Sequence, residues 1–479
     1  MYFLKIFSFL IKTLKLNVNL SIFSVYKEPN GPLYTEGIKN RKETIMRKKK
    51  RKILRTVLLC LFTVILLALS VFMHFGGFGT GESADPKEFA SYAGSIQDIS
   101  IPKEARIIAL GEATHGNVEF QELKLEVFKL LVEKYDVRAF ALEGDYGGCE
   151  QVNRYIHGGD GTALEAARAI GFKIYCTKEM ADLISYMRQY NETAAPGKDL
   201  RFYGFDMQRC TYSFQFLTEG CKKAGIDTES LESLMDGENW VAGYSNEDRI
   251  RILSQIKAQL EKQENTEQTV HCADMLLQYL NLQGKLDAER DDPVVLDALA
   301  TLRDKLLAEN INWIAAQESR AGHDRIFVTG HNTHVARWES YDSMGKLLAD
   351  KMGKGYYVIG TDFYKTCCNV PDQASGKRTN QVFYSHDPLA NAAKKAGLHT
   401  CWLDFSKIPS GTPLGELSRD YVYQGNLGEG YIWYMRLLPP SYRLFQPPAT
   451  LYDSMIFVSE ATPIKILEES NTPMQASRY

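Results

Sequence analysis

Five strand-like segments of the chain each end in side chains that can carry or transfer a proton. The segments are residues 105–110, 137–142, 200–205, 325–330 and 356–361. The residues that follow them, in the same order, are Glu112 with His115, Glu143 with Asp145, Asp206, His331 with His334, and Asp362. In an open parallel sheet the carboxyl ends of the strands meet at one edge, where ligands bind. We therefore expect these residues to form one site.

The chemistry that suits this set is hydrolysis by activated water. One histidine of near-neutral pKa can take a proton from water. A nearby carboxylate can fix its tautomer and stabilise the imidazolium, and further imidazole or amide donors can stabilise an oxyanion. The chain has no Gly-x-Ser-x-Gly nucleophile elbow and no glycine loop of the kind that binds nucleotides.

Other interpretations of the same residues stay open. Glu112, His115, Glu143, His331 and His334 could also bind zinc, iron or manganese, although no His-Glu-x-x-His is present. Taken alone, several of these residues have an ordinary structural explanation, such as an acid at a helix N-terminus or a capping aspartate. The coincidence of four such features at one edge favours a functional site.

The elements that must position the site predict an α/β fold, with a mainly parallel sheet covered by helices. The short apolar segments suit strands buried on both faces. Residues 119–135 and 178–191 between them have a helical period, and this alternation is typical of parallel sheets. Residues 212–320 predict a helical insertion within a hydrolytic domain of residues 91–465. After about residue 362 the chain is rich in turns, which predicts edge strands and loops.

The N-terminal region predicts a signal anchor. Residues 57–75 contain no acidic residue, lysine or arginine, and follow Arg47–Lys52, which are all basic. Such a run spans a bilayer, and flanking positive charge stays cytoplasmic. We expect a cytoplasmic segment 1–52, a transmembrane helix 53–75 and a stalk 76–90. This makes the protein a single-pass protein of the cell membrane with an extracytoplasmic domain. A cleaved signal peptide is the alternative, and translation starting at Met46 is a further hypothesis.

Charge and cysteine content limit the partners. Residues 1–55 hold 14 Lys/Arg and 3 Asp/Glu, so the remainder of a chain with net charge −3 carries −3 − 11 = −14. An acidic body argues against nucleic-acid binding, which needs a basic face. The nine cysteines are scattered, without C-x-x-C or zinc-site spacing, and no disulfide pairing follows from them.

The motifs together resemble those of the erythromycin esterase family. The resembling stretches are LGEATHG (110–116), ALEGDY (141–146), VNRY (152–155), YGFD (203–206), RD (303–304), GHNTHVAR (330–337) and YYVIGTDFY (356–364). The resemblance implies an α/β core with helical additions and a hydrolase, without metal or cofactor, that opens a macrolide lactone with water. It implies that His115 is the general base, that Glu143 supports it and the water, and that His331, His334 and Glu112 complete the site.

Lys124 stands where that family typically has arginines. We predict that it binds the substrate together with Asp145, Arg154 and Asp206. The leading hypothesis is therefore a membrane-anchored esterase acting on a macrolide-like lactone, in the manner of an antibiotic-resistance enzyme. The alternatives are a surface module that binds a metal or haem, and a cell-envelope esterase or transferase acting on an acylated glycan or lipid.

Overall fold

The computed structural model describes residues 32–74, 83–289, 293–338 and 342–467. The chain divides into two compact units, residues 1–68 and 69–479, and each is considered by itself. The proposed start at Met46 concerns residues 1–45, of which 1–31 lie outside the described residues. Residues 76–82 of the predicted stalk, 76–90, also lie outside them.

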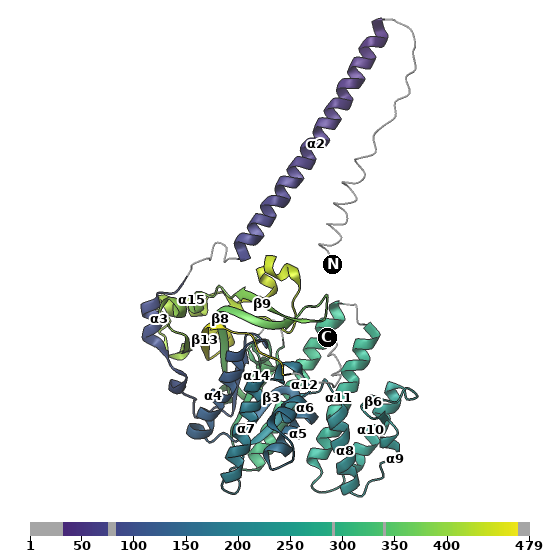
Figure 1. Ribbon diagram of the computed structural model, residues 1–479, viewed down its shortest axis with the longest axis vertical. Coiled ribbons are helices and arrows are strands. Elements are labelled where there is room, and N and C mark those ends of the chain that lie inside the picture. The colour runs from purple at the N-terminus through teal and green to yellow at the C-terminus, as the bar shows by residue number, and fades with distance from the viewer. Residues whose placement is uncertain (1–31, 75–82, 290–292, 339–341, 468–479) are drawn as a thin grey trace. The chain divides into compact units, whose positions relative to one another are not determined.

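The described residues begin with one long helix, α2 (Pro32–His74), drawn in purple in Figure 1, which is the described part of the N-terminal unit and continues past residue 68. Within it, the span Ile45–Phe72 contains an 18-residue window of mean hydropathy 2.5 and is long and apolar enough to cross a membrane. The basic residues 47–52 belong to the same helix, so the predicted boundary at residue 53 is not a break in secondary structure. The described residues thus contain one helix that is a candidate membrane span.

The second unit is built on a nine-stranded sheet among the described residues. The order is β1-β10-β13-β8-β2-β7-β3-β4, and β9 pairs with β8. All pairs from β13 to β4 are parallel, and those made by β1, β9 and β10 are antiparallel. The strands are β1 (Ala93–Gly94), β2 (Ile107–Glu112), β3 (Ala139–Asp145), β4 (Arg201–Asp206), β7 (Ile326–His331), β8 (Tyr356–Pro371), β9 (Arg378–Tyr384), β10 (Thr400–Asp404) and β13 (Ser454–Ala461).

The five predicted strands are therefore confirmed as β2, β3, β4, β7 and β8, and they are adjacent. Their side chains alternate between two cores. In β2, Ile107 and Ala109 pack into one core and Ile108 and Leu110 into the other. Since successive residues of a strand point to opposite faces, a strand buried on both sides must be apolar throughout. This explains the continuous apolar runs of the sequence.

Helices cover both faces. The core that contains Ile108 is closed by helices near the start of the unit, α4 (Val118–Tyr135), α5 (Tyr146–Ile156), α6 (Ala163–Ala169) and α7 (Lys178–Thr193). The opposite core is closed by α3 (Pro86–Tyr92), α8 (Thr211–Lys223), α10 (Asn246–Leu260), α11 (Glu267–Glu289), α12 (Pro293–Arg320), α14 (Met344–Met352) and α15 (Pro388–Lys395). The predicted apolar faces of α4 and α7 are buried as their periodicity indicates.

The interval between β4 and β7 is mainly helical. It contains α8, α10, α11 and α12, which gather beside the sheet in Figure 1. The short helix α9 (Glu229–Glu232) and a hairpin of β5 (Met235–Asp236) and β6 (Asn239–Trp240) complete it. The last of these helices, α12, runs back to the sheet and reaches the carboxyl edge, where its middle residues contact the strand-end side chains described below.

The prediction of only edge strands and loops after residue 362 is wrong for β13. This strand lies inside the sheet, parallel to β8 and antiparallel to β10, and six of its eight residues from Ser454 are buried without interruption. Its sequence, SMIFVSEA, has the apolar run of a buried strand. The remaining elements are α13 (Asn332–Val335), α16 (Pro413–Arg419), α17 (Pro448–Leu451) and the separate pair β11 (Val422–Gly425) and β12 (Arg443–Gln446).

Candidate active site

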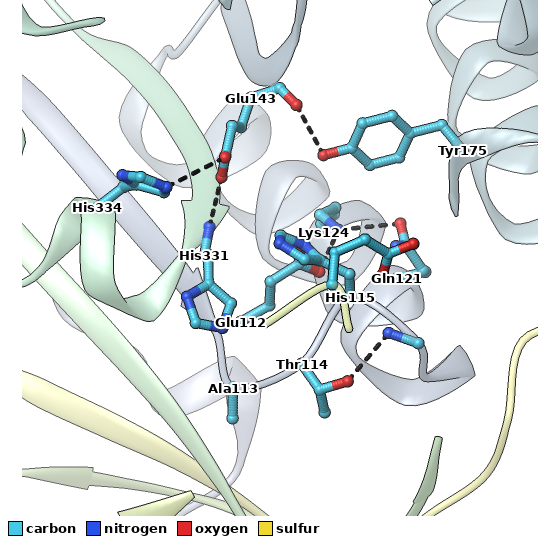
Figure 2. Close-up of polar contacts among 12 residues, drawn as sticks. Glu112, Ala113, Thr114, His115, Gln121, Lys124, Glu143, Tyr175, His331 and His334 are labelled. Atoms are coloured by element: carbon cyan, nitrogen blue, oxygen red, sulfur yellow. Dashed lines mark hydrogen bonds and ion pairs between the residues drawn. The ribbon is translucent and has the colours of Figure 1, made fainter. Parts of the chain in front are cut away.

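The structure brings together five of the eight side chains expected at one edge of the sheet, namely Glu112, His115, Glu143, His331 and His334. Glu112 and His331 are paired residues at the ends of β2 and β7. The rings of His115 and His331 have centroids 4.9 Å apart. Glu143 at the end of β3 accepts a hydrogen bond from the His331 backbone N–H at 2.8 Å, and its carboxylate lies 3.4 Å from Nε2 of His334. Figure 2 shows this cluster.

Glu112, His115 and Lys124 form the first charged group of the cluster. The His115 Nδ1–H donates to Glu112 at 2.7 Å, and the Lys124 ammonium donates to the other carboxylate oxygen at 2.6 Å. The turn after β2 carries His115, and α4 carries Lys124. Gly116 closes this turn against backbone, because an added Cβ would lie 2.4 Å from the Asn369 carbonyl oxygen. Burial raises the pKa of Glu112, but Lys124 and His115 outweigh it and lower that pKa to about 2.

The role expected for Glu143 needs correction, because the carboxylate that holds His115 is Glu112. Both oxygens of Glu143 are engaged elsewhere, one by the His331 backbone and the other by Arg303 at 3.0 Å and by His334. The reason is the strand order. Glu112 and His115 share one turn, whereas β7 lies between β2 and β3. Burial raises the pKa of Glu143, but His334 and Arg303 dominate and hold that pKa well below its usual range.

His115 has the properties of a base with one nitrogen available. Its Nδ1 faces Glu112, and its Nε2 makes no hydrogen bond to any residue that the structure describes. The side chain is 11% exposed. Burial lowers the pKa of His115, but the Glu112 carboxylate more than compensates, and the pKa lies above its ordinary value of 6.5. Nε2 is therefore the position from which His115 can exchange a proton with water.

His331 is held neutral in a single tautomer. Its Nε2–H donates to the Leu427 carbonyl at 3.2 Å, so Nδ1 accepts from the Thr333 hydroxyl at 2.7 Å. Burial and the neighbouring His115 and His334 lower the pKa of His331 to about 3. His331 can therefore serve as a neutral hydrogen-bond donor beside His115, and it is a poor general base at neutral pH.

Two charged residues of α12, Arg303 and Asp304, complete the cluster and were not among the predicted site residues. Arg303 donates to Asp206 at 2.6 Å and to Glu143 at 3.0 Å. Asp304 accepts from Nδ1 of His334 at 2.5 Å and from the Met344 backbone at 3.2 Å. Burial lowers the pKa of His334, but Glu143 and Asp304 outweigh it and raise the pKa. The signal available in the sequence was the Arg-Asp pair itself, one of the stretches that carry the family resemblance.

The four predicted substrate-binding residues have different surroundings. Lys124 and Asp206 are buried in the cluster, each tied to an oppositely charged partner. Asp145 caps α5 by accepting from Gly148 at 2.9 Å, and burial raises its pKa to about 7. Arg154 is not brought to the cluster. It lies in the last turn of α5, paired with Glu219 at 2.8 Å and 43% exposed.

The fifth strand-end acid, Asp362, is buried apart from the cluster. It accepts from the Gly425 backbone at 3.0 Å and from the Ser385 hydroxyl at 3.1 Å. Burial raises its pKa to about 6. This supports the structural explanation for Asp362. As for metal binding, residues 32–74, 83–289, 293–338 and 342–467 contain no group of three or more His, Cys, Asp or Glu side chains placed to hold an ion.

Comparison with known proteins agrees with this architecture. The family model for erythromycin esterase matches residues 132–461, which include Glu143, Arg303, Asp304, His331 and His334. The putative hydrolase YbfO of Bacillus subtilis is 25% identical over 391 residues, 70% of this chain and 85% of that protein. Erythromycin esterase type II of Escherichia coli is 23% identical over 355 residues, 64% of this chain and 82% of that protein.

Solved structures share the fold. A Bacillus cereus protein superposes with a TM-score of 0.66 at 19% identity, covering 80% of this chain and 100% of that one. A mutant of the erythromycin esterase EreC in its open conformation superposes with a TM-score of 0.53 at 15% identity, covering 77% and 93%. The family model alone covers well over half of the 479 residues. The chain belongs to the erythromycin esterase family.

Proposed function

We propose that this family member hydrolyses carboxylic esters with water activated by His115, and that a macrolide-like lactone is its nominal substrate. Family membership supports hydrolysis. The observation that carries the mechanism is the Glu112–His115 pair, with Nδ1 bound to the carboxylate at 2.7 Å and Nε2 left open. A carboxylate in this position fixes the tautomer of the imidazole and stabilises its protonated form, as in catalytic triads.

The proposed reaction proceeds in two proton transfers. Nε2 of His115 takes a proton from water as the water oxygen attacks the ester carbonyl carbon, and the carbonyl oxygen becomes an oxyanion. The same nitrogen then returns the proton to the departing alkoxide as the carbon–oxygen bond breaks. Between the two steps His115 is an imidazolium, and the Glu112 carboxylate at 2.7 Å balances its charge. The products are a carboxylic acid and an alcohol.

His331 is the proposed donor to the oxyanion. Its Nε2–H now donates to the Leu427 carbonyl at 3.2 Å, close to the His115 ring. A substrate carbonyl oxygen that replaced Leu427 would receive the same proton. Because the lowered pKa of His331 keeps it neutral with its one proton on Nε2, this N–H is the group that would donate a hydrogen bond to the oxyanion.

The pH dependence of hydrolysis is expected to report His115. A general base must be unprotonated, so kcat should rise with pH through the pKa of His115, and the midpoint should lie above pH 6.5 because Glu112 raises that pKa. In a Glu112→Gln variant this pKa falls, so the midpoint should move to lower pH. The plateau should also drop about a hundredfold or more, since the imidazolium loses its counter-charge. Initial rates between pH 5 and 10, a range set by the ordinary histidine pKa, measure both.

Two further variants distinguish a change in the pKa of His115 from a nonspecific loss of activity. Glu126→Gln removes an exposed carboxylate from the same helix that carries Lys124 and should leave the profile unchanged. The double variant Glu112→Gln/Lys124→Met removes the buried ion pair as a unit. Its pH midpoint should lie below that of wild type but above that of Glu112→Gln, because no unpaired Lys124 ammonium then repels the imidazolium of His115. An unshifted midpoint in Glu112→Gln would show that the rate-limiting base is not His115.

An acylated glycan or lipid of the cell envelope is the second candidate substrate class, favoured by the membrane-spanning candidate helix α2. The full chain should be assayed against macrolides, simple esters and acylated envelope fractions, with and without a chelator. Hydrolysis that persists in chelator supports the His115 mechanism. Hydrolysis lost in chelator and restored by one metal would instead support a metal site, which was the alternative left open by the sequence.

Membrane attachment through α2 is a further part of the proposal, with the hydrolytic domain outside the cell. The full chain is expected to remain in membranes after alkaline carbonate extraction, and protease added to intact cells should digest the domain. The variant Val64→Arg/Leu67→Arg should release the protein, since each arginine at the centre of a span costs about 2.5–3.5 kcal/mol. The control Val64→Leu/Leu67→Val keeps the helix apolar and should behave as wild type. A protected domain would contradict the proposed sidedness.

A further inference from the structure

A cavity of about 670 Å³ is lined by residues that contact the turn carrying His115. Its walls come from three parts of the chain: the β8–β9 hairpin, the short helix Lys173–Tyr175 and residues 463–466 after β13. The lining residues are Lys173, Asn369, Gly376, Lys377, Arg378, Asn380, Pro463, Ile464, Lys465 and Ile466. We call this cavity the basic cleft.

The lining of the basic cleft has a net positive charge. Its lining contains four cationic side chains and no acidic one. Arg378 is held in the wall, because it forms an ion pair with Glu429 and donates from Nε to the Asn369 side chain at 2.7 Å. Lys173, Lys377 and Lys465 are exposed and form no ion pair with any part of the chain that the structure describes. After subtraction of the Glu429 charge, three positive charges face the cavity.

This charge is opposite in sign to that of the body that carries it. The residues after 55 have a net charge of −14, so an anion is repelled by most of the surface. A cavity of one sign on a surface of the other concentrates ligands of complementary charge and steers them toward it. The three exposed lysines come from three separate segments and line one cavity, so a single bound anion could interact with all of them.

The basic cleft shares its floor with the turn that carries His115. The Gly116 carbonyl, one residue after His115, accepts hydrogen bonds from the backbone N–H groups of two lining residues, Asn369 and Ile464, both at 3.0 Å. On the other wall, the helix that bears Lys173 also bears Tyr175, whose hydroxyl donates to the Glu143 backbone carbonyl at 2.9 Å. Two walls of the cleft are thus fixed directly to the catalytic edge.

We propose that the basic cleft binds an anionic arm, a carboxylate or a phosphate, of the ester that His115 hydrolyses. The inference rests on the proposed function and narrows its substrate class to esters that carry such an arm. Lysine suits this task better than arginine. Its ammonium is a point charge on a flexible side chain and can bind anions of different geometry, whereas the guanidinium of arginine is planar and rigid. A neutral macrolide-like lactone would leave these three charges unused.

The experiment compares two series of para-nitrophenyl esters with the full chain in detergent. One series carries a terminal carboxylate, from the glutarate to the sebacate monoester, and the other carries fatty acids of equal chain length. The readout is the ratio of kcat/KM for the anionic ester to that for its neutral match. In the variant Lys377→Gln/Lys465→Gln we expect this ratio to fall about five- to tenfold at low salt, which is the usual contribution of two exposed ion pairs. At high salt the fall should be much smaller, because salt screens exposed charges.

The matched control is Lys223→Gln/Lys351→Gln, which removes two exposed lysines from α8 and α14 and changes the net charge equally. Its ratio should equal that of wild type. Equal ratios in the wild type and the Lys377/Lys465 variant at every chain length would overturn the proposal. So would a parallel loss in the control variant, because it would show that only overall charge matters.

A binding measurement distinguishes failure of this proposal from failure of the proposed function. Titration calorimetry with tripolyphosphate and with citrate should show binding that weakens about five- to tenfold in the Lys377/Lys465 variant but not in the control. The stronger of the two ligands identifies the preferred anion. Lysine-dependent binding without hydrolysis of any ester would refute the esterase and retain the anion site. Hydrolysis of neutral esters without lysine-dependent anion binding would support the esterase and refute the anion site.

Discussion

Replacing His115 by alanine is expected to lower kcat for ester hydrolysis by about a hundred- to ten-thousand-fold, the usual contribution of a general base. His115 is the histidine of the cluster that combines a carboxylate at Nδ1 with an unbonded Nε2. His331 is held neutral as a donor to Leu427, and His334 lies between Asp304 and Glu143. Neither can therefore take its place. Steady-state rates on simple esters measure the loss.

The fold should survive this substitution. Without His115 the buried Glu112 carboxylate keeps Lys124 at 2.6 Å, so no buried charge is left alone. The far-ultraviolet circular dichroism of the variant should match that of wild type. His399→Ala is the matched control, since His399 is an exposed histidine outside the cluster. Full turnover in the His115 variant would end the mechanism, whatever the family of the chain.

Replacing Arg303 by methionine is expected to reduce the free energy of unfolding by about 3–5 kcal/mol, the typical effect of breaking a buried ion pair from one side. Arg303 donates to Asp206 at 2.6 Å and to Glu143 at 3.0 Å, and these carboxylates are 1% and 9% exposed. Methionine fills similar volume but leaves both anions without their shared cation. Urea unfolding followed by circular dichroism measures the change.

Arg154→Met provides the control for this prediction. Arg154 also pairs with a glutamate, Glu219, at 2.8 Å, but the two side chains are 43% and 48% exposed. An exposed ion pair is worth no more than about 1 kcal/mol, because water solvates both charges when it breaks. The contrast between the two arginines tests whether burial decides the energy. Equal losses in Arg303→Met and Arg154→Met would show that Arg303 is not the electrostatic centre of the cluster.

The sequence alone determined the class of fold and the edge of the sheet at which the site lies. Strands buried on both faces must be apolar throughout, and the helices between them must carry an apolar stripe, so both appear as local patterns. Polar residues that directly follow such strands must lie at the carboxyl edge. This is why Glu112, His115, Glu143, His331 and His334 can be grouped from their positions along the chain, and why they are adjacent in space.

The tertiary structure alone decided the partners within that group. Glu112 rather than Glu143 holds His115, because β7 lies between their strands. Arg303 and Asp304 enter from the middle of α12, about a hundred residues after the strand end at Asp206. No strand-end pattern marks them, since a helix reaches the site only through its packing on the sheet. Strand order and helix docking depend on contacts between distant segments, and a local pattern of residues does not record them.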